Sequence, residues 1–232
     1  MSAPEPYFDD GQVRLFLGDC REIAEWVAAD VLVTDPPYGR GWRSGSGMTN
    51  SHGRGRGSVA HGGIAGDEDT AVRDEALAGW GGRPAMIFGD PLVARPPGSV
   101  QVLAYAKPID AGVKGARAGF RRDFEEVFLV GAWPVGVGGG SSILRTGGLV
   151  AGPRGIGTRN GHPHAKPVDV MEQLISACPP GVIADPFAGS GSTLVAARNL
   201  GRRAIGVEIE ERYAEAAARR LSQATLFSGE AS

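Results

Sequence analysis

The chain has 232 residues, of which 42% are hydrophobic and 22% charged. This composition excludes an intrinsically disordered chain, and two cysteines are too few for a disulfide scaffold. No apolar run reaches the roughly 18 residues of a membrane span, and the N-terminus lacks the features of a signal peptide. We therefore expect a single cytoplasmic domain over residues 1–232, with no membrane partner.

The net charge of −2 hides an uneven distribution. Residues 39–66 and 131–167 together hold eight basic residues and no acid, so the rest of the chain carries −10. Such separation is typical of an acidic body that presents basic segments to a polyanion. The alternative is that two loops lack acids by chance.

Short apolar runs alternate with helical patterns along the chain. The runs predict strands at 13–17, 31–34, 85–88, 100–105, 126–130, 182–184 and 204–207. Apolar positions at helical spacing predict helices at 21–28, 169–178, 192–200 and 210–221. Because several strands are continuously apolar, they predict an α/β fold: a seven-stranded, mostly parallel sheet with helices on both faces.

Two glycine-rich windows interrupt this pattern. Residues 39–66 have almost no apolar periodicity, which predicts a long mobile loop. Residues 131–165 are similar apart from one short apolar patch. Loops of this length within a compact domain are usually functional or disordered.

The segment 181–213 predicts a strand, a tight glycine turn, a helix, a second strand and an acid. Gly189 and Gly191 allow a sharp bend and a close approach to a ligand, and the helix from Ser192 directs free amide groups into the same space. Glu208 follows the second strand, where a carboxylate can accept hydrogen bonds from both hydroxyls of a ribose. This pattern predicts a site for an adenosine moiety, although the turn alone could be a plain loop closure.

The residues around the turn narrow the choice of cofactor. A dinucleotide fingerprint would have a third glycine where this chain has Leu194, and no Gly-Lys-Ser/Thr loop for phosphates is present. Asp185 precedes the turn, and an acid there suits a cationic group, such as the ammonium of a methionine moiety, better than a pyrophosphate.

A second motif lies near the N-terminus, where an apolar strand ends in Asp35-Pro36-Pro37-Tyr38. The two prolines restrict the backbone and hold a carboxylate, carbonyl oxygens and an aromatic ring in fixed relative positions. In open α/β sheets, the carboxyl end of a strand is where ligands bind. The alternative, a strand stop followed by a plain turn, does not account for the flanking Asp and Tyr.

DPPY at 35–38 together with DPFAGSGST at 185–193 resembles the amino-group DNA methyltransferases, which use S-adenosylmethionine (SAM) to methylate adenine N6 or cytosine N4. The DPPY motif precedes the SAM turn, as in the class with the beta order of motifs, and HPHAKP at 162–167 is similar to that class's segment before the SAM strand. The resemblance implies a circularly permuted, Rossmann-like SAM-dependent methyltransferase fold. It covers nearly the whole chain except the two glycine-rich windows.

The resemblance also implies roles for the DPPY residues. Asp35 and the Pro36 carbonyl would each accept one N–H of the target amine, Pro37 would hold the segment rigid, and Tyr38 would stack on the base. The base would flip out of double-stranded DNA, and the methyl group would move by direct displacement, without a metal or a covalent intermediate.

Further residues are implied to bind SAM or DNA. The permutation would place Asp19 and Cys20 beside the cofactor's adenine, although Asp19 could instead cap the helix that follows. Lys166 would reach the carboxylate of SAM, and the cofactor site would also include Asp185, Phe187, Gly189, Gly191, Thr193 and Glu208. Window 131–165 occupies the place of the family's target-recognition segment. The expected DNA-binding residues of the two windows are Arg40, Arg43, Arg54, Arg56, Arg145, Arg154 and Arg159.

The resulting prediction is a site-specific DNA adenine-N6 methyltransferase of a restriction–modification or phage system, in a bacterial or phage-infected cell, that could pair as a homodimer. Cytosine-N4 methylation by the same residues is the nearest alternative, and Asp rather than Ser at position 35 favours adenine. A DNA-binding module with a vestigial SAM fold is a third possibility, and the intact motifs argue against it. Leu194 and the DPPY motif disfavour a nicotinamide-dependent oxidoreductase.

Overall fold

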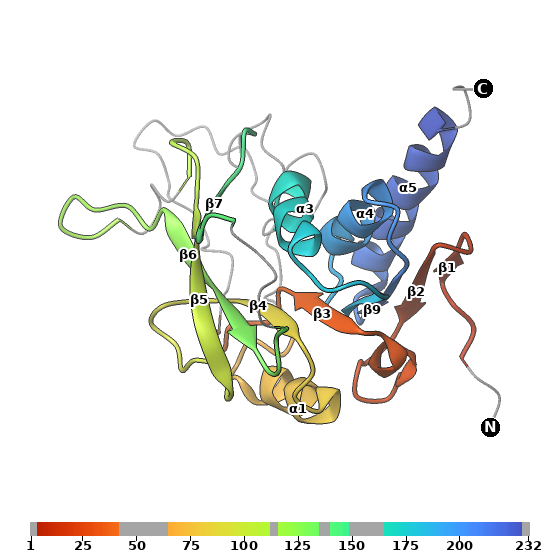
Figure 1. Cartoon of the computed structure of the whole chain (residues 1–232), viewed down its shortest axis with the longest axis horizontal. Helices are drawn as coiled ribbons and strands as arrows, with labels where there is room; N and C mark the ends of the chain where they lie inside the picture. Colours follow the sequence, from red (N-terminus) through yellow and green to blue (C-terminus); the bar gives the residue numbers. More distant parts are fainter. Residues whose placement is uncertain (1–3, 42–64, 112–115, 135–139, 149–164, 229–232) are drawn as a thin grey trace, which may run out of the picture.

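The computed structural model describes residues 4–41, 65–111, 116–134, 140–148 and 165–228. They form a mixed nine-stranded sheet in the order β1-β2-β9-β8-β3-β4-β6-β5-β7, with helices packed on both faces (Figure 1). An α/β fold was the prediction, and it is confirmed.

Each of the seven predicted strands is present, with small shifts at the ends. They are β2 (Val13–Leu17), β3 (Val31–Thr34), β4 (Ala85–Gly89), β5 (Ser99–Ala106), β6 (Phe124–Val130), β8 (Ile183–Asp185) and β9 (Ala204–Glu208). The predicted count of seven is wrong, because the short strands β1 (Phe8–Asp9) and β7 (Ile143–Arg145) add one strand at each edge. Edge strands of two or three residues pair on one side only, so they need no apolar run that a sequence pattern could reveal.

Five of the eight strand pairings are parallel. Strands β2, β9, β8, β3 and β4 run in one direction, and β6 is antiparallel to both β4 and β5. The carboxyl ends of the five parallel strands therefore meet at one edge of the sheet, whether they come from the start or the end of the chain.

Each face of the sheet is covered by its own set of helices. The helices α3 (Val168–Ser176), α4 (Ser192–Asn199) and α5 (Glu211–Ser228) cover one face, and α1 (Ala71–Trp80) with the 3-10 helix η1 (Glu25–Ala28) covers the other (Figure 1). Strand β3 shows the alternation that this requires, because Val31 and Val33 belong to one apolar cluster and Leu32 to the other. No helix in the described part of the chain is long and apolar enough to cross a membrane.

Two helical predictions need correction. The helix expected over 21–28 is a turn followed by the 3-10 helix η1. The carbonyl of Asp19 accepts the N–H groups of both Glu22 and Ile23, which forms a tight turn in place of a regular first helical turn. Helix α1 was not predicted, because its buried face consists of Arg73, Ala76 and Trp80 rather than an apolar stripe.

Candidate active site

The carboxyl ends of the central strands border a cavity of about 840 Å³. Its wall includes the DPPY segment, which follows β3, and residues 185–190, which follow β8. The two motifs also touch directly, since the hydroxyl of Thr34 donates a 2.6 Å hydrogen bond to Oδ1 of Asp185. The parallel pairing of β3 with β8 therefore brings together segments about 150 residues apart in the chain.

At the DPPY end, Asp35 is held by two neighbours. The hydroxyl of Tyr38 donates a 2.7 Å hydrogen bond to Oδ1 of Asp35, and Nζ of Lys166 lies 2.6 Å from Oδ2. Burial and the carboxylate of Asp35 raise the pKa of Tyr38 well above its usual value, so the phenol stays neutral. The predicted residues Asp35, Pro36, Pro37 and Tyr38 all line the cavity.

Lys166 is part of a chain of alternating charges. Its Nζ also lies 3.3 Å from Oε2 of Glu125, whose Oε1 is 2.6 Å from Nζ of Lys107. Burial favours the neutral form of Lys166, but the carboxylates of Asp35 and Glu125 outweigh it and raise the pKa of its ammonium. Burial likewise opposes the charge of Glu125, yet Lys166 and Lys107 keep the pKa of its carboxyl below the usual value. Lys166 and Glu125 are therefore both charged at neutral pH.

On another part of the cavity wall, the carboxylate of Glu208 contacts the glycine turn. Its Oε2 accepts a 2.7 Å hydrogen bond from the N–H of Gly189, and its Oε1 accepts one of 2.8 Å from Glu210. Burial raises the pKa of Glu208 to about 7, against the effect of these two backbone donors. The carboxylate has lone pairs left for hydroxyl donors of a ligand.

Asp185 has a similar environment. Its carboxylate accepts hydrogen bonds from Thr34 and from the backbone N–H of Phe187, and the hydroxyl of Thr193 also favours its charged form. Burial outweighs these donors and raises the pKa of Asp185 to about 6. The described ion pairs include none with Asp185 or Glu208.

The glycine turn closes with two residues at positive φ, Gly189 at 51° and Gly191 at 79°. Gly189 lines the cavity, as do the predicted residues Phe187 and Thr193. Gly191 is not part of the cavity wall: it is the N-cap of α4, and a Cβ there would lie 2.9 Å from Cβ of Ala217 in α5. Gly191 therefore lets the start of α4 pack closely against α5.

Asp19 and Cys20 follow β2 and also line the cavity. Hydrogen bonds from the side chain of Arg21 lower the pKa of Asp19, and burial raises the pKa of the Cys20 thiol to about 12. Cys20 is thus a neutral, weakly polar part of the wall. Cys178 is buried in the apolar core below α3.

The predicted DNA-binding arginines divide into three groups. Arg40 lines the cavity, where its guanidinium contacts Oδ2 of Asp90. Arg145 ends the edge strand β7 and lies outside the cavity wall. The other five, Arg43, Arg54, Arg56, Arg154 and Arg159, lie outside the described residues.

Several residues of the cavity wall were not predicted. They are the acids Asp67, Asp90 and Glu125, the bases Lys107 and Arg122, and the aromatic Phe124. A weak signal existed in the β6 sequence FEEVFLV, where an acid inside a predominantly apolar strand implies a buried partner. Asp67 could not be recognised, because its carboxylate accepts hydrogen bonds from the backbone of Gly39 and Arg40 and only the fold brings them together. Among the described residues, no cluster of His, Cys, Asp and Glu could hold a metal ion.

Comparisons with known proteins point in the same direction as the geometry. Residues 143–219 match the family model N6_N4_Mtase, described as DNA methylase. The type II methyltransferase M.ScaI of Streptomyces caespitosus is 49% identical over 65 residues, which are 27% of this chain and 21% of that protein. M2.DpnII of Streptococcus pneumoniae is 45% identical over 62 residues, 26% of this chain and 23% of that protein. These matches thus span less than a quarter of each curated relative.

Solved structures share the fold over most of the chain. The PvuII DNA methyltransferase, which is cytosine-N4-specific, has a TM-score of 0.62 at 15% identity, over 94% of this chain and 89% of that one. The M1.HpyAVI–SAM complex has a TM-score of 0.55 at 19% identity, over 90% and 99%. Residues 143–219 are therefore similar in sequence to the N6-adenine/N4-cytosine DNA methylases, which is the family that the motifs resemble, and most of the chain shares the fold of solved DNA methyltransferases.

Proposed function

We propose that the protein transfers a methyl group from SAM to an exocyclic amine of a base in double-stranded DNA. One observation carries the proposal: a single cavity is lined both by the DPPY segment and by the glycine turn with its buried acid. A methyl donor bound at the glycine turn and an acceptor bound at the DPPY segment would share this cavity, and orientation is the main requirement of a direct displacement.

The cofactor end fits SAM by its chemistry. Glu208 presents a carboxylate beside the backbone of Gly189, an arrangement suited to the two hydroxyls of a ribose. Asp185 is a buried acid whose donors among the described residues are neutral, and a ligand with a positive charge would supply a counterion. When bound, SAM supplies the methyl group. We assign Asp19, Cys20, Phe187 and Thr193 to the rest of its site, because all four line the same cavity.

The DPPY end acts on the target amine. The lone pair of an exocyclic amine is delocalised into the ring, so acceptors that bind its N–H groups favour the pyramidal, nucleophilic form. Asp35 accepts one N–H with a carboxylate that Lys166 and Tyr38 already orient, and the Pro36 carbonyl accepts the other. Tyr38 stacks on the base.

We assign Lys166 to the positioning of Asp35. Its ammonium lies between the carboxylates of Asp35 and Glu125, which hold it in place. The role expected from the family resemblance, contact with the carboxylate of SAM, is the alternative. The two roles differ in whether removal of the charge weakens cofactor binding.

We propose adenine N6 as the target atom, because Asp stands first in the motif. The structural likeness to a cytosine-N4 enzyme keeps cytosine as the second candidate. We also propose a circularly permuted methyltransferase domain: β2 near the N-terminus pairs in parallel with β9 near the C-terminus, as the permutation requires.

Transfer of tritium from methyl-labelled SAM to duplex DNA tests the proposal. We expect labelled N6-methyladenine on nucleoside analysis of the product. N4-methylcytosine would instead identify the second candidate, and DNA binding without transfer would support a non-catalytic module. NADH binding without SAM binding would support an oxidoreductase.

A further inference from the structure

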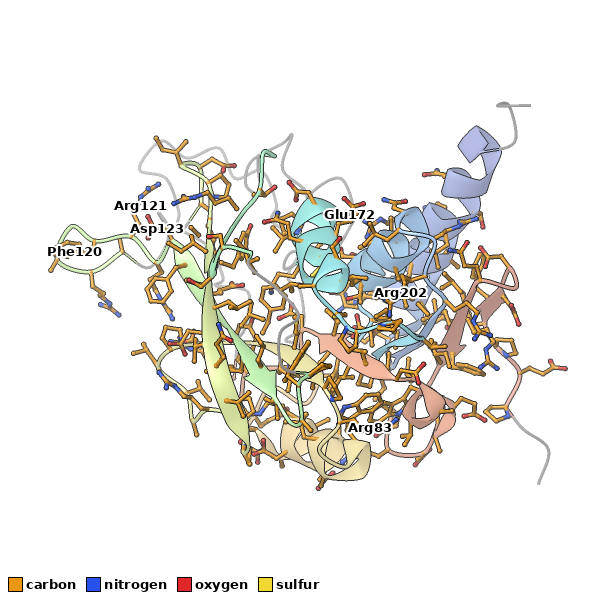
Figure 2. The ribbon with its side chains drawn as sticks, viewed as in Figure 1. Arg83, Phe120, Arg121, Asp123, Glu172 and Arg202 are labelled. Atoms are coloured by element: carbon orange, nitrogen blue, oxygen red, sulfur yellow. The ribbon has the colours of Figure 1, made fainter. Side chains whose placement is uncertain are left out.

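The chain between β5 and β6 projects away from the sheet. Residues 107–111 and 116–123 of it are described, and the second stretch carries the exposed aromatic ring of Phe120. Figure 1 shows this projection on the opposite side of the molecule from α5, and Figure 2 places Phe120 at its far end. Phe120 is 80% exposed, and Ile109 on the other arm is 83% exposed. Exposed apolar side chains that gather on one projection, rather than lying singly over the surface, are typical of an interaction site.

The tip has the geometry of a tight hairpin. The N–H of Arg117 donates to the carbonyl of Phe120 at 3.0 Å, and the N–H of Phe120 donates back at 2.9 Å. The two residues between them, Ala118 and Gly119, have φ values of 48° and 82°, as in a type I′ turn. Among the residues that the structure describes, Ala118 is the one non-glycine residue with positive φ, a conformation that costs about 1–2 kcal/mol. The chain thus holds a strained turn that fixes the directions of Arg117 and Phe120.

The base of the projection is anchored and continuous with the cavity. Arg121 donates to the carbonyls of Ile109 and Ala111 on the opposite arm and pairs with Asp123 at 3.1 Å (Figure 2). Arg122 pairs with Asp90 at 2.8 Å and lines the cavity. Phe120 is only two residues beyond Arg122, so its Cα lies within about 7 Å of that of a wall residue.

The charge of the hairpin indicates the kind of partner. Residues 116–123 contain Arg117, Arg121, Arg122 and Asp123, a net charge of +2 in a chain of net charge −2. Asp123 pairs with Arg121, and no described hydrogen bond, ion pair or ring contact involves the side chain of Arg117 or Phe120. An aromatic ring beside an uncompensated guanidinium suits a polyanion with stackable bases. A second copy of this chain, whose net charge is only −2, would offer neither a polyanion nor stackable bases.

We propose that the hairpin at residues 116–123 is a contact for duplex DNA beside the target base, with Arg117 on a phosphate and Phe120 packed against a sugar or base. This assignment rests on the proposed function, because the cavity that the hairpin adjoins must receive the target base. It adds a DNA contact outside the two glycine-rich windows.

The test compares tip variants with matched surface controls. We expect Phe120→Ala and Arg117→Ala each to raise the KM for DNA about tenfold at unchanged kcat, because neither side chain touches the reacting atoms. Arg117→Ala should also reduce the slope of log Kd against log salt by about 1. Leu200→Ala and Arg219→Ala remove an exposed apolar and an exposed basic side chain that are not part of the cavity wall, and both should leave the KM unchanged.

Two variants at the turn separate the hairpin's shape from its side chains. Ala118→Gly removes the strain and should keep the affinity for DNA, whereas Ala118→Pro cannot reach positive φ and should weaken it as Phe120→Ala does. Wild-type KM and salt slope in both Phe120→Ala and Arg117→Ala would overturn the inference. So would a change of oligomeric state in sedimentation without a change in DNA affinity. Absence of methyl transfer by the wild-type protein, by contrast, would count against the proposed function itself.

Discussion

Two parts of the cavity wall hold their acidic side chains in opposite ways. We call them the DPPY end, around residues 35–38, and the glycine-turn end, around residues 185–191 and Glu208. At the DPPY end, Asp35 and Glu125 both contact the ammonium of Lys166. At the glycine turn, the described partners of Asp185 and Glu208 are hydroxyl and backbone N–H groups only. The pKa of Glu125 is accordingly below its usual value, whereas burial raises the pKa of Asp185 to about 6 and that of Glu208 to about 7.

This difference separates what the protein supplies from what a ligand supplies. A buried acid with a built-in cation keeps its charge, so the DPPY end is preorganised before any base arrives. A buried acid without a cation is stabilised when a ligand brings hydrogen-bond donors or positive charge. The glycine-turn end should therefore respond to ligand and pH, and the DPPY end to the removal of its internal partners.

The largest effect is expected from Asp35→Ala. Loss of the acceptor for the amine should reduce methyl transfer at least about 10³-fold, while SAM affinity stays within several-fold, because Asp35 belongs to the DPPY end. Rapid-quench transfer assays and calorimetric SAM titration measure the two quantities. Glu22→Ala, which removes an exposed acid, is the matched control. A loss of SAM binding with folding intact would contradict the division between the ends.

Lys166→Met should come next. Removal of the buried cation leaves Asp35 and Glu125 as neighbouring half-buried acids, and we expect about 2–3 kcal/mol of destabilisation in urea unfolding, less than for a fully buried pair. Transfer should fall about 100-fold, because Asp35 is no longer oriented. Addition of Glu125→Gln should restore part of the stability without restoring kcat, since the repulsion between the two carboxylates is removed but Asp35 still lacks its cation.

The same variant decides between the two roles of Lys166. SAM affinity within a few-fold of wild type supports positioning of Asp35. A loss of about tenfold or more, with kcat at saturating SAM preserved, would support the contact with the cofactor's carboxylate. Lys166→Arg keeps the charge and should recover part of kcat if positioning is the role.

A smaller effect is expected from the titration of Glu208. Its carboxylate form should bind the ribose hydroxyls, so SAM affinity should rise with pH through about 7, by up to about tenfold per unit below that value. The Gln side chain of Glu208→Gln does not titrate, so this variant should bind SAM more weakly and without the slope. Any slope that it still shows measures the titration of the ligand and is subtracted from that of wild type. Equal slopes in wild type and variant would remove Glu208 from the site.

Stability without ligand should change in the opposite direction. Because the folded-state pKa of Glu208 lies above the ordinary 4.5, the folded protein binds more protons than the unfolded chain between pH 4.5 and about 7. Its contribution to the free energy of unfolding therefore falls as pH rises through that window. Denaturation of wild type and Glu208→Gln at pH 5 and pH 8 measures this difference.

The sequence predicted most of the cavity lining around the glycine turn but missed several lining residues around the DPPY segment, for a physical reason. Strands β3, β8 and β9 are buried on both faces and are therefore visible in the sequence as apolar runs. They end in Thr34, Asp185 and Glu208, of which the two acids line the cavity and the threonine donates to Asp185. The DPPY motif and the glycine turn are contiguous in sequence. Their residues could therefore be recognised locally.

Glu125 and Lys107 could not be recognised in that way. They become partners of Lys166 only because β6 and β5 pair in antiparallel and place them beside the end of β3. The hairpin tip escaped notice for a similar reason: RAGF has no strand pattern, and Ala118 gives no sign of positive φ. Long-range charge pairs and strained turns leave little periodic signal in a single sequence.

The smallest effect is expected from the glycine turn itself. Gly191→Ala and Gly201→Ala both introduce a Cβ at positive φ, 79° and 68°, which costs about 1–2 kcal/mol each. At Gly201 the space is open, but at Gly191 the new Cβ meets Cβ of Ala217 at 2.9 Å, so overpacking adds about 1–3 kcal/mol. Urea unfolding of the two variants measures the difference, and equal losses would show that α5 yields at this contact. Because Gly191 is the N-cap of α4 and Gly189 precedes it in the turn, a shift there should also lower SAM affinity several-fold, which Gly201→Ala at the far end of α4 should not.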